Sequence, residues 1–220
     1  ARVLIIGLGG LGSPVAFYLA SAGVGTLVLA DDDVVDESNL QRQIIHGEAD
    51  VGINKVASAK ASIAALNSGV LVETLRQRLS GEMLVKEVLK ADVVVDCCDN
   101  LVTRLAVNKA CLQHQTPMIS GAAIRMEGQV IVVDPRAPST PCYHCLMQFT
   151  GEQEHSCSTT GVMAPIVGII GAIQAMEAIK VISNFGQPLV GKLLLLDAKT
   201  MQWKTFSLPK DPACPSCSKI

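Results

Sequence analysis

Short, almost continuously apolar stretches alternate with longer mixed stretches along the first half of the chain. The apolar runs predict strands, and the mixed runs, whose apolar positions recur every three or four residues, predict helices. Strands without polar alternation are typical of a parallel sheet that helices cover on both faces. The order predicts an α/β fold with a doubly wound, Rossmann-like, mostly parallel sheet. The expected strands are 2–6, 26–31, 70–76, 92–98 and 117–123, and the helices between them are 11–23, 53–67, 81–90 and 101–115.

The pattern changes after Gly121, where apolar runs no longer alternate regularly with helices. We expect antiparallel strands here that extend the sheet and shape a substrate groove. The expected strands are 128–134, 191–198 and 202–208, with one long helix at 165–182 between the first two.

The length of 220 residues, of which 49% are hydrophobic, suits a single domain over 1–220. Within it, 1–121 would hold the doubly wound sheet and 122–220 the extension. The net charge of −2 is spread without runs, which argues against nucleic acid or an anionic membrane as partner.

The N-terminal "ARVLIIGLGG" indicates a strand that enters a glycine turn, and it lacks the layout of a signal peptide. The long apolar segment at 161–182 contains Gln174, Glu177 and Lys180, so we expect a buried helix and not a membrane span. These features predict a soluble, cytoplasmic protein. In a reducing compartment, the eight cysteines are metal ligands or reactive thiols more often than disulfides.

A glycine-rich turn joins the first expected strand to the first helix. Glycines at such a turn let phosphates approach backbone N–H groups at a helix N-terminus. Asp31 follows at the end of the second strand, where a carboxylate can accept hydrogen bonds from ribose hydroxyls. These features predict an adenine nucleotide, with NAD as one candidate, while the alternative is a tight turn without a ligand. The glycines are Gly7, Gly9, Gly10 and Gly12.

Two cations and an aspartate followed by an asparagine favour a ligand with more phosphate charge than NAD. Arg42 and Lys55 lie beyond the second strand, and Asp99 and Asn100 follow the strand "DVVVDCC". Ligands of doubly wound sheets bind at the ends of such strands. A carboxylate there can hold Mg²⁺. Each cation taken alone could equally be a solvated surface side chain, but together with the glycine turn they favour phosphate chemistry.

Four of the cysteines form two C-x-x-C pairs, Cys142 with Cys145 and Cys214 with Cys217. Two such pairs can supply four thiolates to a tetrahedral Zn²⁺, and a site with four protein ligands is structural. The expected zinc clasp would tie the C-terminal segment to the loop after the strand at 128–134. The alternative is a redox dithiol in either pair.

The other cysteines of interest differ in their surroundings. Cys157 lies in the polar segment "EHSCSTTG", where it could be a reactive thiol or an unreactive loop residue. We expect Cys97, Cys98 and Cys111 to be core residues in a strand and a helix.

Several motifs resemble those of the MoeB/ThiF/HesA adenylyltransferases, which are relatives of the ubiquitin-activating enzymes. The resemblance extends from Arg2 to Cys217. "SGAAIRMEGQV" and "GVMAPIVGIIGAIQAMEAIK" look most similar to the molybdopterin-synthase branch. "LVLADDD" occurs equally in the thiamin branch. The motifs that carry the resemblance are "GLGGLGSP", "SNLQRQ", "GINK", "DCCDN" followed by Arg104, and "SGAAIRMEGQ".

The resemblance implies ATP-dependent adenylation of the C-terminal Gly-Gly carboxylate of a small ubiquitin-like sulfur carrier, with release of pyrophosphate. A carboxylate nucleophile is ionised near neutral pH and needs no general base, so the four histidines need no catalytic role. The cofactors implied are ATP, Mg²⁺ and structural Zn²⁺. Arg42, Lys55 and Asp99 would be catalytic, with Asp99 on Mg²⁺. The thiamin branch implies a sulfur-transfer thiol at Cys157, whereas in the molybdopterin branch this cysteine has no evident role. The implied nucleotide ligands are Gly7, Gly9, Gly10, Gly12, Asp31, Asp33, Asn39, Arg42, Lys55, Asp99 and Asn100.

In the resembling family, 1–121 would be the nucleotide-binding half and 122–220 the half that binds the carrier and zinc. The family implies a homodimer with composite sites and an N-terminal helix whose arginine reaches the partner subunit's ATP. This chain starts at the first strand, so we expect either that the sequence is truncated or that this contribution is missing. Without an appended sulfurtransferase domain, sulfur would come from a separate donor such as a cysteine desulfurase or rhodanese.

The molybdopterin-pathway carrier is the expected substrate and the thiamin-pathway carrier the alternative. Two hypotheses from other classes are an NAD-dependent oxidoreductase and a scaffold that only binds the carrier.

Overall fold

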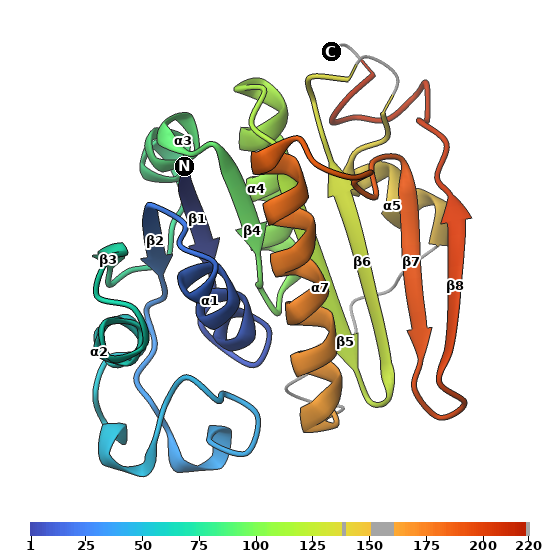
Figure 1. The fold of residues 1–220 in the computed structure, drawn as a ribbon. Coiled ribbons are helices and arrows are strands. Elements are labelled where there is room, and N and C mark those ends of the chain that lie inside the picture. The colour runs from blue at the N-terminus through green and yellow to red at the C-terminus, as the bar shows by residue number, and fades with distance from the viewer. Residues whose placement is uncertain (138–139, 151–160, 219–220) are drawn as a thin grey trace.

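One twisted sheet of eight strands organises the structure, a computed structural model that describes residues 1–137, 140–150 and 161–218 (Figure 1). The strand order is β3-β2-β1-β4-β5-β6-β7-β8. Strands β1 to β5 pair in parallel, and β6 to β8 are added antiparallel, as predicted. The strands are β1 Arg2–Ile6, β2 Thr26–Ala30, β3 Leu71–Leu75, β4 Val93–Asp96, β5 Met118–Ile124, β6 Glu127–Val133, β7 Lys192–Asp197 and β8 Gln202–Ser207.

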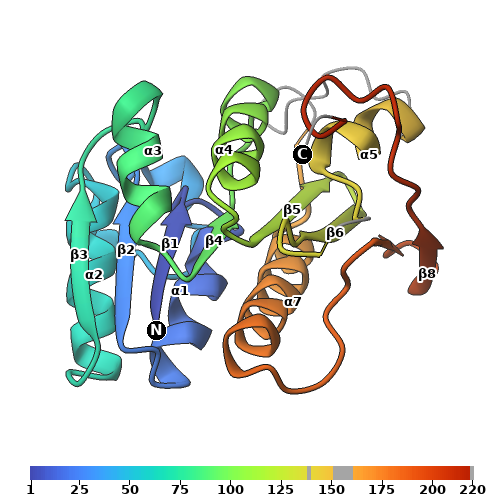
Figure 2. The same ribbon diagram turned by 90° about the horizontal axis from the view of Figure 1, so that it is seen from above.

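Helices cover both faces of this sheet (Figure 2). Helices α1, α2 and α7 pack on one face in a core with the apolar side chains of β1, β2 and β4. Helices α3, α4 and α5 pack on the other face in a second core. The doubly wound α/β prediction is therefore confirmed. The helices are α1 Gly12–Ser21, α2 Lys55–Leu66, α3 Gly81–Lys90, α4 Leu101–Gln113, α5 Tyr143–Thr150 and α7 Ala164–Ser183.

Side-chain caps fix where two of these helices begin. The Asn54 side chain accepts a hydrogen bond from the backbone N–H of Val56, and the Asn100 side chain accepts one from Thr103 at 2.9 Å. Such caps satisfy backbone donors that the first turn of a helix leaves unpaired. As a result, Lys55 at the start of α2 and Asp99 just before α4 are held at defined places.

Helix α7 is long and apolar enough to cross a membrane by length and composition alone. Its residues Ile166, Ile170, Gln174 and Ala178 recur every four positions and are buried. Side chains with that spacing share one face of a helix, and in Figure 1 α7 lies along the sheet beside α1. Helix α7 is therefore a core helix, as predicted.

Two details differ from the sequence-based expectation. Strand β4 ends at Asp96, so Cys97 and Cys98 lie just after the strand and not within it. Helix α5, which starts between the cysteines of the first C-x-x-C pair, was not predicted, because its eight residues are too short to show a clear apolar period.

The chain crosses from one half of the sheet to the other between β1 and β4, which are neighbours although β2 and β3 come between them in sequence. The loops that follow β1 and β4 therefore diverge to opposite faces and leave a crevice at the carboxyl edge. Ligands of doubly wound sheets bind at such a reversal point.

Candidate active site

A cavity of about 1070 Å³ opens at this carboxyl edge and continues along β5 to β8. Its lining includes every residue predicted to bind the nucleotide except Gly12. Residues far apart in the sequence are thus brought to one place. The predicted residues in the lining are Gly7, Gly9, Gly10, Asp31, Asp33, Asn39, Arg42, Lys55, Asp99 and Asn100.

Gly7 and Gly12 are required by the close backbone contacts of the turn. Gly7 has a φ of 94°, and a Cβ there would lie 2.8 Å from the carbonyl oxygen of Cys97. A Cβ on Gly12 would lie 1.9 Å from the carbonyl oxygen of Gly7. Gly12 therefore lets α1 start directly against the turn, while Gly7, Gly9 and Gly10 face the cavity.

The carboxylate of Asp31 fastens the glycine turn to the end of β2. Its Oδ2 accepts a hydrogen bond from the backbone N–H of Leu8 at 2.7 Å, and its Oδ1 accepts one from the N–H of Asp33 at 2.8 Å. A carboxylate can accept about four hydrogen bonds. Asp31 can therefore hold the turn and still accept hydrogen bonds from a ligand hydroxyl in the cavity.

Two cations reach the cavity from the segment after β2. Lys55 is buried, and its Nζ lies 2.9 Å from Oδ2 of the exposed Asp33. Arg42 Nη2 donates a hydrogen bond to Asn39 Oδ1 at 2.7 Å. Because a buried lysine is rare without an anionic partner, Lys55 is poised to contact either Asp33 or a ligand phosphate.

Asp99 and Asn100 form the opposite wall, at the start of α4. Asn100 Nδ2 lies 3.3 Å from Asp99 Oδ1. Asp99 is exposed, so its carboxylate is accessible from the cavity. An accessible carboxylate beside a phosphate site is a donor that Mg²⁺ accepts.

Sequence reasoning missed the buried ion pair beneath this wall. Asp96 is fully buried and accepts a hydrogen bond from Ser120 Oγ at 2.6 Å, and its Oδ2 lies 3.3 Å from Arg104 Nε. Burial opposes the charge on Arg104 most strongly, but the negative charge of Asp96 together with the contributions of Tyr143 and Cys98 outweighs it, and the pKa of Arg104 is raised. An acid inside an otherwise apolar strand was the available signal for Asp96. In the sequence, Arg104 stands out only because it follows the family motif "DCCDN".

Gln43 is a second missed residue, next to Arg42 in the sequence. It is buried and lines the cavity, and its Oε1 accepts no hydrogen bond from the residues that the structure describes. A buried amide oxygen without a partner is costly, so Gln43 is suited to meet a donor on a ligand.

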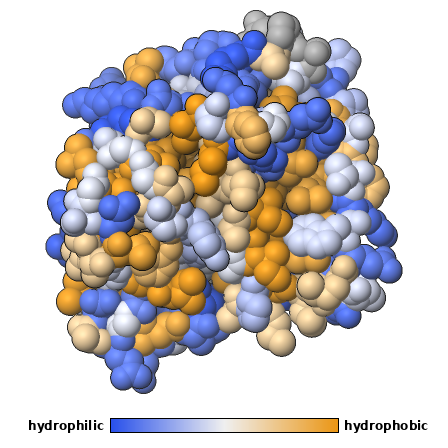
Figure 3. Space-filling model, in the orientation of Figure 1, coloured by the Kyte–Doolittle hydropathy of each residue, from blue (hydrophilic) through white to orange (hydrophobic). Residues whose placement is uncertain are grey.

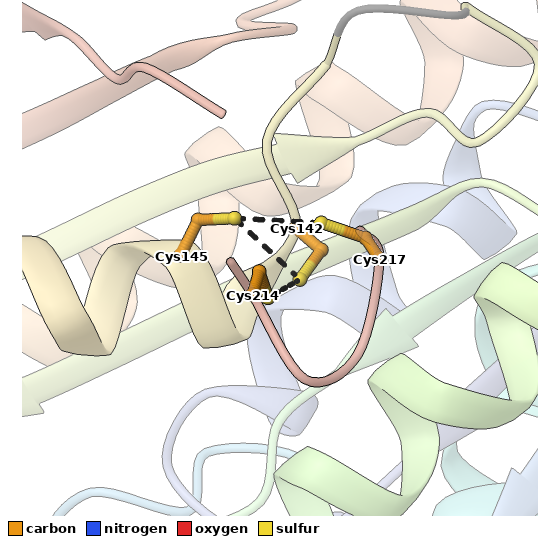
Figure 4. Close-up of side chains that lie close together, drawn as sticks. All are labelled: Cys142, Cys145, Cys214 and Cys217. Carbon is orange, nitrogen blue, oxygen red and sulfur yellow. Dashed lines mark hydrogen bonds between the residues drawn. The ribbon is translucent and has the colours of Figure 1, made fainter. Parts of the chain in front are cut away.

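The four clasp cysteines converge in space (Figure 4). Their sulfur atoms lie within 4.8 Å of one another, with 3.5 Å from Cys145 to Cys217 and 3.7 Å from Cys142 to Cys214. Four thiolates on one zinc ion at about 2.3 Å place their sulfurs about 3.8 Å apart. The donor set therefore fits a tetrahedral zinc ion, whereas two separate redox pairs would not need to converge.

Three further cysteines are buried in the two cores. Burial raises the pKa of Cys97, Cys98 and Cys111 well above the usual thiol range, so these thiols stay protonated and unreactive. All three contribute to the two cores, as predicted. Cys157 lies outside the described residues.

Comparison with known proteins agrees with this geometry. Residues 1–216 match the model of the ThiF family. The chain is 45% identical over 219 residues to the molybdopterin-synthase adenylyltransferase of Salmonella typhimurium, covering 100% of this chain and 88% of that protein. It is 46% identical over 217 residues to the sulfur carrier protein ThiS adenylyltransferase of Escherichia coli, covering 99% and 86% respectively. Among solved structures, E. coli MccB with ATP is similar with a TM-score of 0.84 and 25% identity, over 99% of this chain and 66% of MccB.

Proposed function

Because the chain belongs to the ThiF family, we propose that it adenylates the C-terminal carboxylate of a small sulfur carrier protein, using ATP and releasing pyrophosphate. The similar proteins named as adenylyltransferases of the molybdopterin and thiamin pathways support this reaction class. The similar MccB structure with ATP supports the choice of nucleotide.

The observation that carries the proposal is the set of residues that line the large cavity. The glycine turn and Asp31 suit an adenine nucleotide, and Arg42 and Lys55 supply two positive charges for its phosphates. The same cavity continues along β5 to β8, past Tyr143 and Met147. That extension gives the flexible tail of a second protein a path to the nucleotide.

The chemistry requires positioning and charge stabilisation. A carboxylate oxygen of the carrier attacks the α-phosphorus, the bond to the bridging oxygen breaks, and pyrophosphate leaves with its electrons. Arg42 and Lys55 offset the negative charge that grows on the leaving group, and Asn39 holds Arg42 in place. The attacking carboxylate is already ionised near neutral pH, so no general base is needed.

Two metal ions accompany the proposal. Asp99 would hold Mg²⁺, which when bound neutralises phosphate charge beside the reacting phosphorus. Cys142, Cys145, Cys214 and Cys217 would hold a structural Zn²⁺, since four protein ligands leave no open position for substrate.

Two carriers are candidate substrates, one from the molybdopterin pathway and one from the thiamin pathway. The chain is 45% identical to an adenylyltransferase of the first kind and 46% identical to one of the second. We put the molybdopterin-synthase type first, on the motifs at 120–130 and 161–180. Pyrophosphate exchange with ATP, measured with each purified carrier and with a carrier lacking its last glycine, tests the proposal. Exchange that depends on the intact tail supports it. Carrier binding without exchange would indicate a scaffold, and NAD binding without exchange an oxidoreductase.

We further propose a cytoplasmic homodimer that receives sulfur from a separate donor, such as a cysteine desulfurase or rhodanese. The outward side of α7 supports the assembly, because Met176 is 57% exposed and Ile169 and Ile173 are only partly covered. Figure 3 shows apolar side chains gathered over α7 on this face of the molecule.

A further inference from the structure

Tyr143 stands between two of the clasp cysteines, Cys142 and Cys145, at the first position of α5. It is 3% exposed and lines the large cavity. A single residue thus belongs both to the metal-binding segment and to the wall of the proposed reaction site.

Tyr143 is attached to α4 at two points. Its hydroxyl accepts a hydrogen bond from Arg104 Nη1 at 3.0 Å, and its backbone N–H donates one to Asn108 Oδ1 at 2.9 Å. Arg104 and Asn108 are four positions apart, so they lie one above the other on the same face of the helix. The two bonds fix both the position and the direction of the tyrosine side chain.

Arg104 in turn has its guanidinium group held on three sides. Nε pairs with Asp96, Nη2 donates to the carbonyl oxygens of Cys98 and Gly121, and Nη1 donates to Tyr143. The guanidinium carbon also lies 5.3 Å from the centre of the tyrosine ring, in a cation–π contact. A guanidinium has five N–H donors, and these bonds use four of them, which leaves one Nη1 donor without a partner among the described residues.

The remaining N–H donor is on Arg104 Nη1, the nitrogen that also donates to the Tyr143 hydroxyl. Because Arg104 lines the cavity, the hydrogen bond to the tyrosine hydroxyl helps to fix where the planar guanidinium group, and with it this donor, is placed. Loss of the hydroxyl would remove one of the four hydrogen bonds that hold this planar, rigid group, so the guanidinium as a whole, with its remaining Nη1 donor, would be free to tilt.

We propose that Tyr143 is a positioning residue that couples the four-cysteine site to Arg104 in the cavity. With zinc bound, the segment of Cys142 and Cys145 is fastened to that of Cys214 and Cys217, and Tyr143 is held between them. Without zinc this segment loosens, Tyr143 shifts, and the Nη1 donor of Arg104 is lost to the ligand. The coupling itself is structural, and only its effect on rate rests on the proposed function.

The test begins with Tyr143→Phe, which keeps the ring and removes the hydroxyl. The matched control is Tyr18→Phe on the exposed side of α1, because Tyr18 is the other tyrosine of the chain. We expect Tyr143→Phe to keep one zinc per chain and to stay folded, with an unfolding temperature lower by a few degrees because one buried hydrogen bond is lost. We expect its exchange rate at saturating ATP to fall about tenfold, the scale of one hydrogen bond to a charged group. Tyr18→Phe should match the unsubstituted protein.

A double-mutant cycle decides whether Tyr143 acts through Arg104. In an Arg104→Lys background, Tyr143→Phe should change the rate by less than about twofold, because the bond it would break is already absent. A tenfold loss in both backgrounds would mean that Tyr143 acts independently of Arg104 and would overturn the proposal. An unchanged rate in the single variant would overturn it as well.

A spectroscopic readout is independent of activity. The ¹⁵N–¹H resonance of Arg104 Nε, assigned by its disappearance in Arg104→Lys, should shift when a chelator removes zinc from the unsubstituted protein. In Tyr143→Phe the zinc-dependent shift should be much smaller. If the chemical shift of this resonance did not change on zinc removal from the unsubstituted protein, the coupling would be refuted. If the protein catalysed no exchange at all, the proposed function would fail, while the coupling would still be tested here.

Discussion

The guanidinium group of Arg42 donates a hydrogen bond to the side-chain carbonyl of Asn39 over 2.7 Å. A second bond runs from Arg42 Nη1 to the carbonyl oxygen of Ser38 at 3.4 Å. Both partners belong to the short 3₁₀ turn Glu37–Asn39, which the Asp36 side chain caps by accepting from the Ser38 N–H. The arginine is therefore oriented toward the cavity before any phosphate binds, which reduces the entropy lost when it does.

Replacing Arg42 by alanine should leave nucleotide binding largely intact but reduce adenylate formation about 10²-fold or more, the usual scale for a lost charge-stabilising donor. Pyrophosphate exchange and ATP binding measured on the same preparation separate the two effects. Arg136→Ala is the matched control, because Arg136 pairs with Asp134 and is absent from the lining of the cavity. Unchanged exchange in the Arg42 variant would refute its assignment.

Much of this architecture could be predicted because strong local signals coincide with it. The apolar runs predicted the eight strands. The turn glycines and Asp31 predicted the position of the crevice, because the carboxyl ends of parallel strands lie at the same edge of the sheet. The four cysteines were predicted to converge from their spacing alone, and they do.

The residues that sequence reasoning missed have partners distant in the chain. The burial of the Asp96 carboxylate is explained by its contacts with Arg104 and Ser120, which α4 and β5 bring to it. The sequence does not distinguish Tyr143 from an ordinary aromatic residue, because its partners Arg104 and Asn108 lie on α4, against which α5 packs. Gly12 shows the opposite case, because it fits the nucleotide motif in the sequence yet is absent from the cavity lining. Local patterns predict elements, but not which polar side chains meet after packing.

The contact at Gly12 gives a prediction on stability. In Gly12→Ala the new Cβ would lie 1.9 Å from a backbone oxygen, which a side-chain rotation cannot relieve. We expect a loss of about 3 kcal/mol or more, or a failure to fold. Gly168→Ala in α7 is the control, because a Cβ there meets nothing within 4 Å, and it should be neutral or stabilise by up to about 1 kcal/mol. Urea unfolding of both variants measures the difference, and a Gly12→Ala protein as stable as the control would contradict it.

The zinc clasp gives a second prediction on stability. The doubly substituted Cys214→Ser, Cys217→Ser protein should contain no zinc, and protease should cleave its C-terminal segment faster, because a four-thiolate site contributes folding energy. Cys111→Ala is the control, since it removes a buried thiol outside the cluster and should retain one zinc per chain. Freshly purified unsubstituted protein without zinc would refute the metal assignment.

His46 predicts a pH dependence of stability. It is buried, its Nε2 lies 3.2 Å from the carbonyl oxygen of Leu8, and its Nδ1 lies 2.8 Å from Ser58 Oγ. Because the carbonyl only accepts, Nε2 carries the proton, and neutral Nδ1 accepts from the serine. Burial lowers the pKa of His46 below its usual value. The unfolded chain therefore takes up a proton first as the pH falls.

The contribution of His46 is thus present above the unfolded pKa near 6.5 and is lost as the pH falls toward the lower folded value. One such group lowers the unfolding free energy by at most about 1.4 kcal/mol per pH unit. Unfolding in urea between pH 7.5 and 5 should show a shallower slope for His46→Gln than for the unsubstituted protein. Equal slopes for the two proteins would count against this account.

The outward side of α7 gives the final prediction, on assembly. Ile169, Ile173 and Met176 follow a helical spacing on the side away from the sheet, and Met176 is 57% exposed. A charged residue at an exposed helix position costs a monomer little, but in an apolar interface it would be buried without a partner at several kcal/mol. We therefore expect light scattering at micromolar concentration to give twice the 23.2 kDa chain mass for the unsubstituted protein and the chain mass for Met176→Glu. Leu89→Glu on α3, which lies on the opposite face of the sheet and is 58% exposed, should stay dimeric. An unsubstituted protein that is monomeric and still adenylates its carrier would show that one subunit alone completes the site.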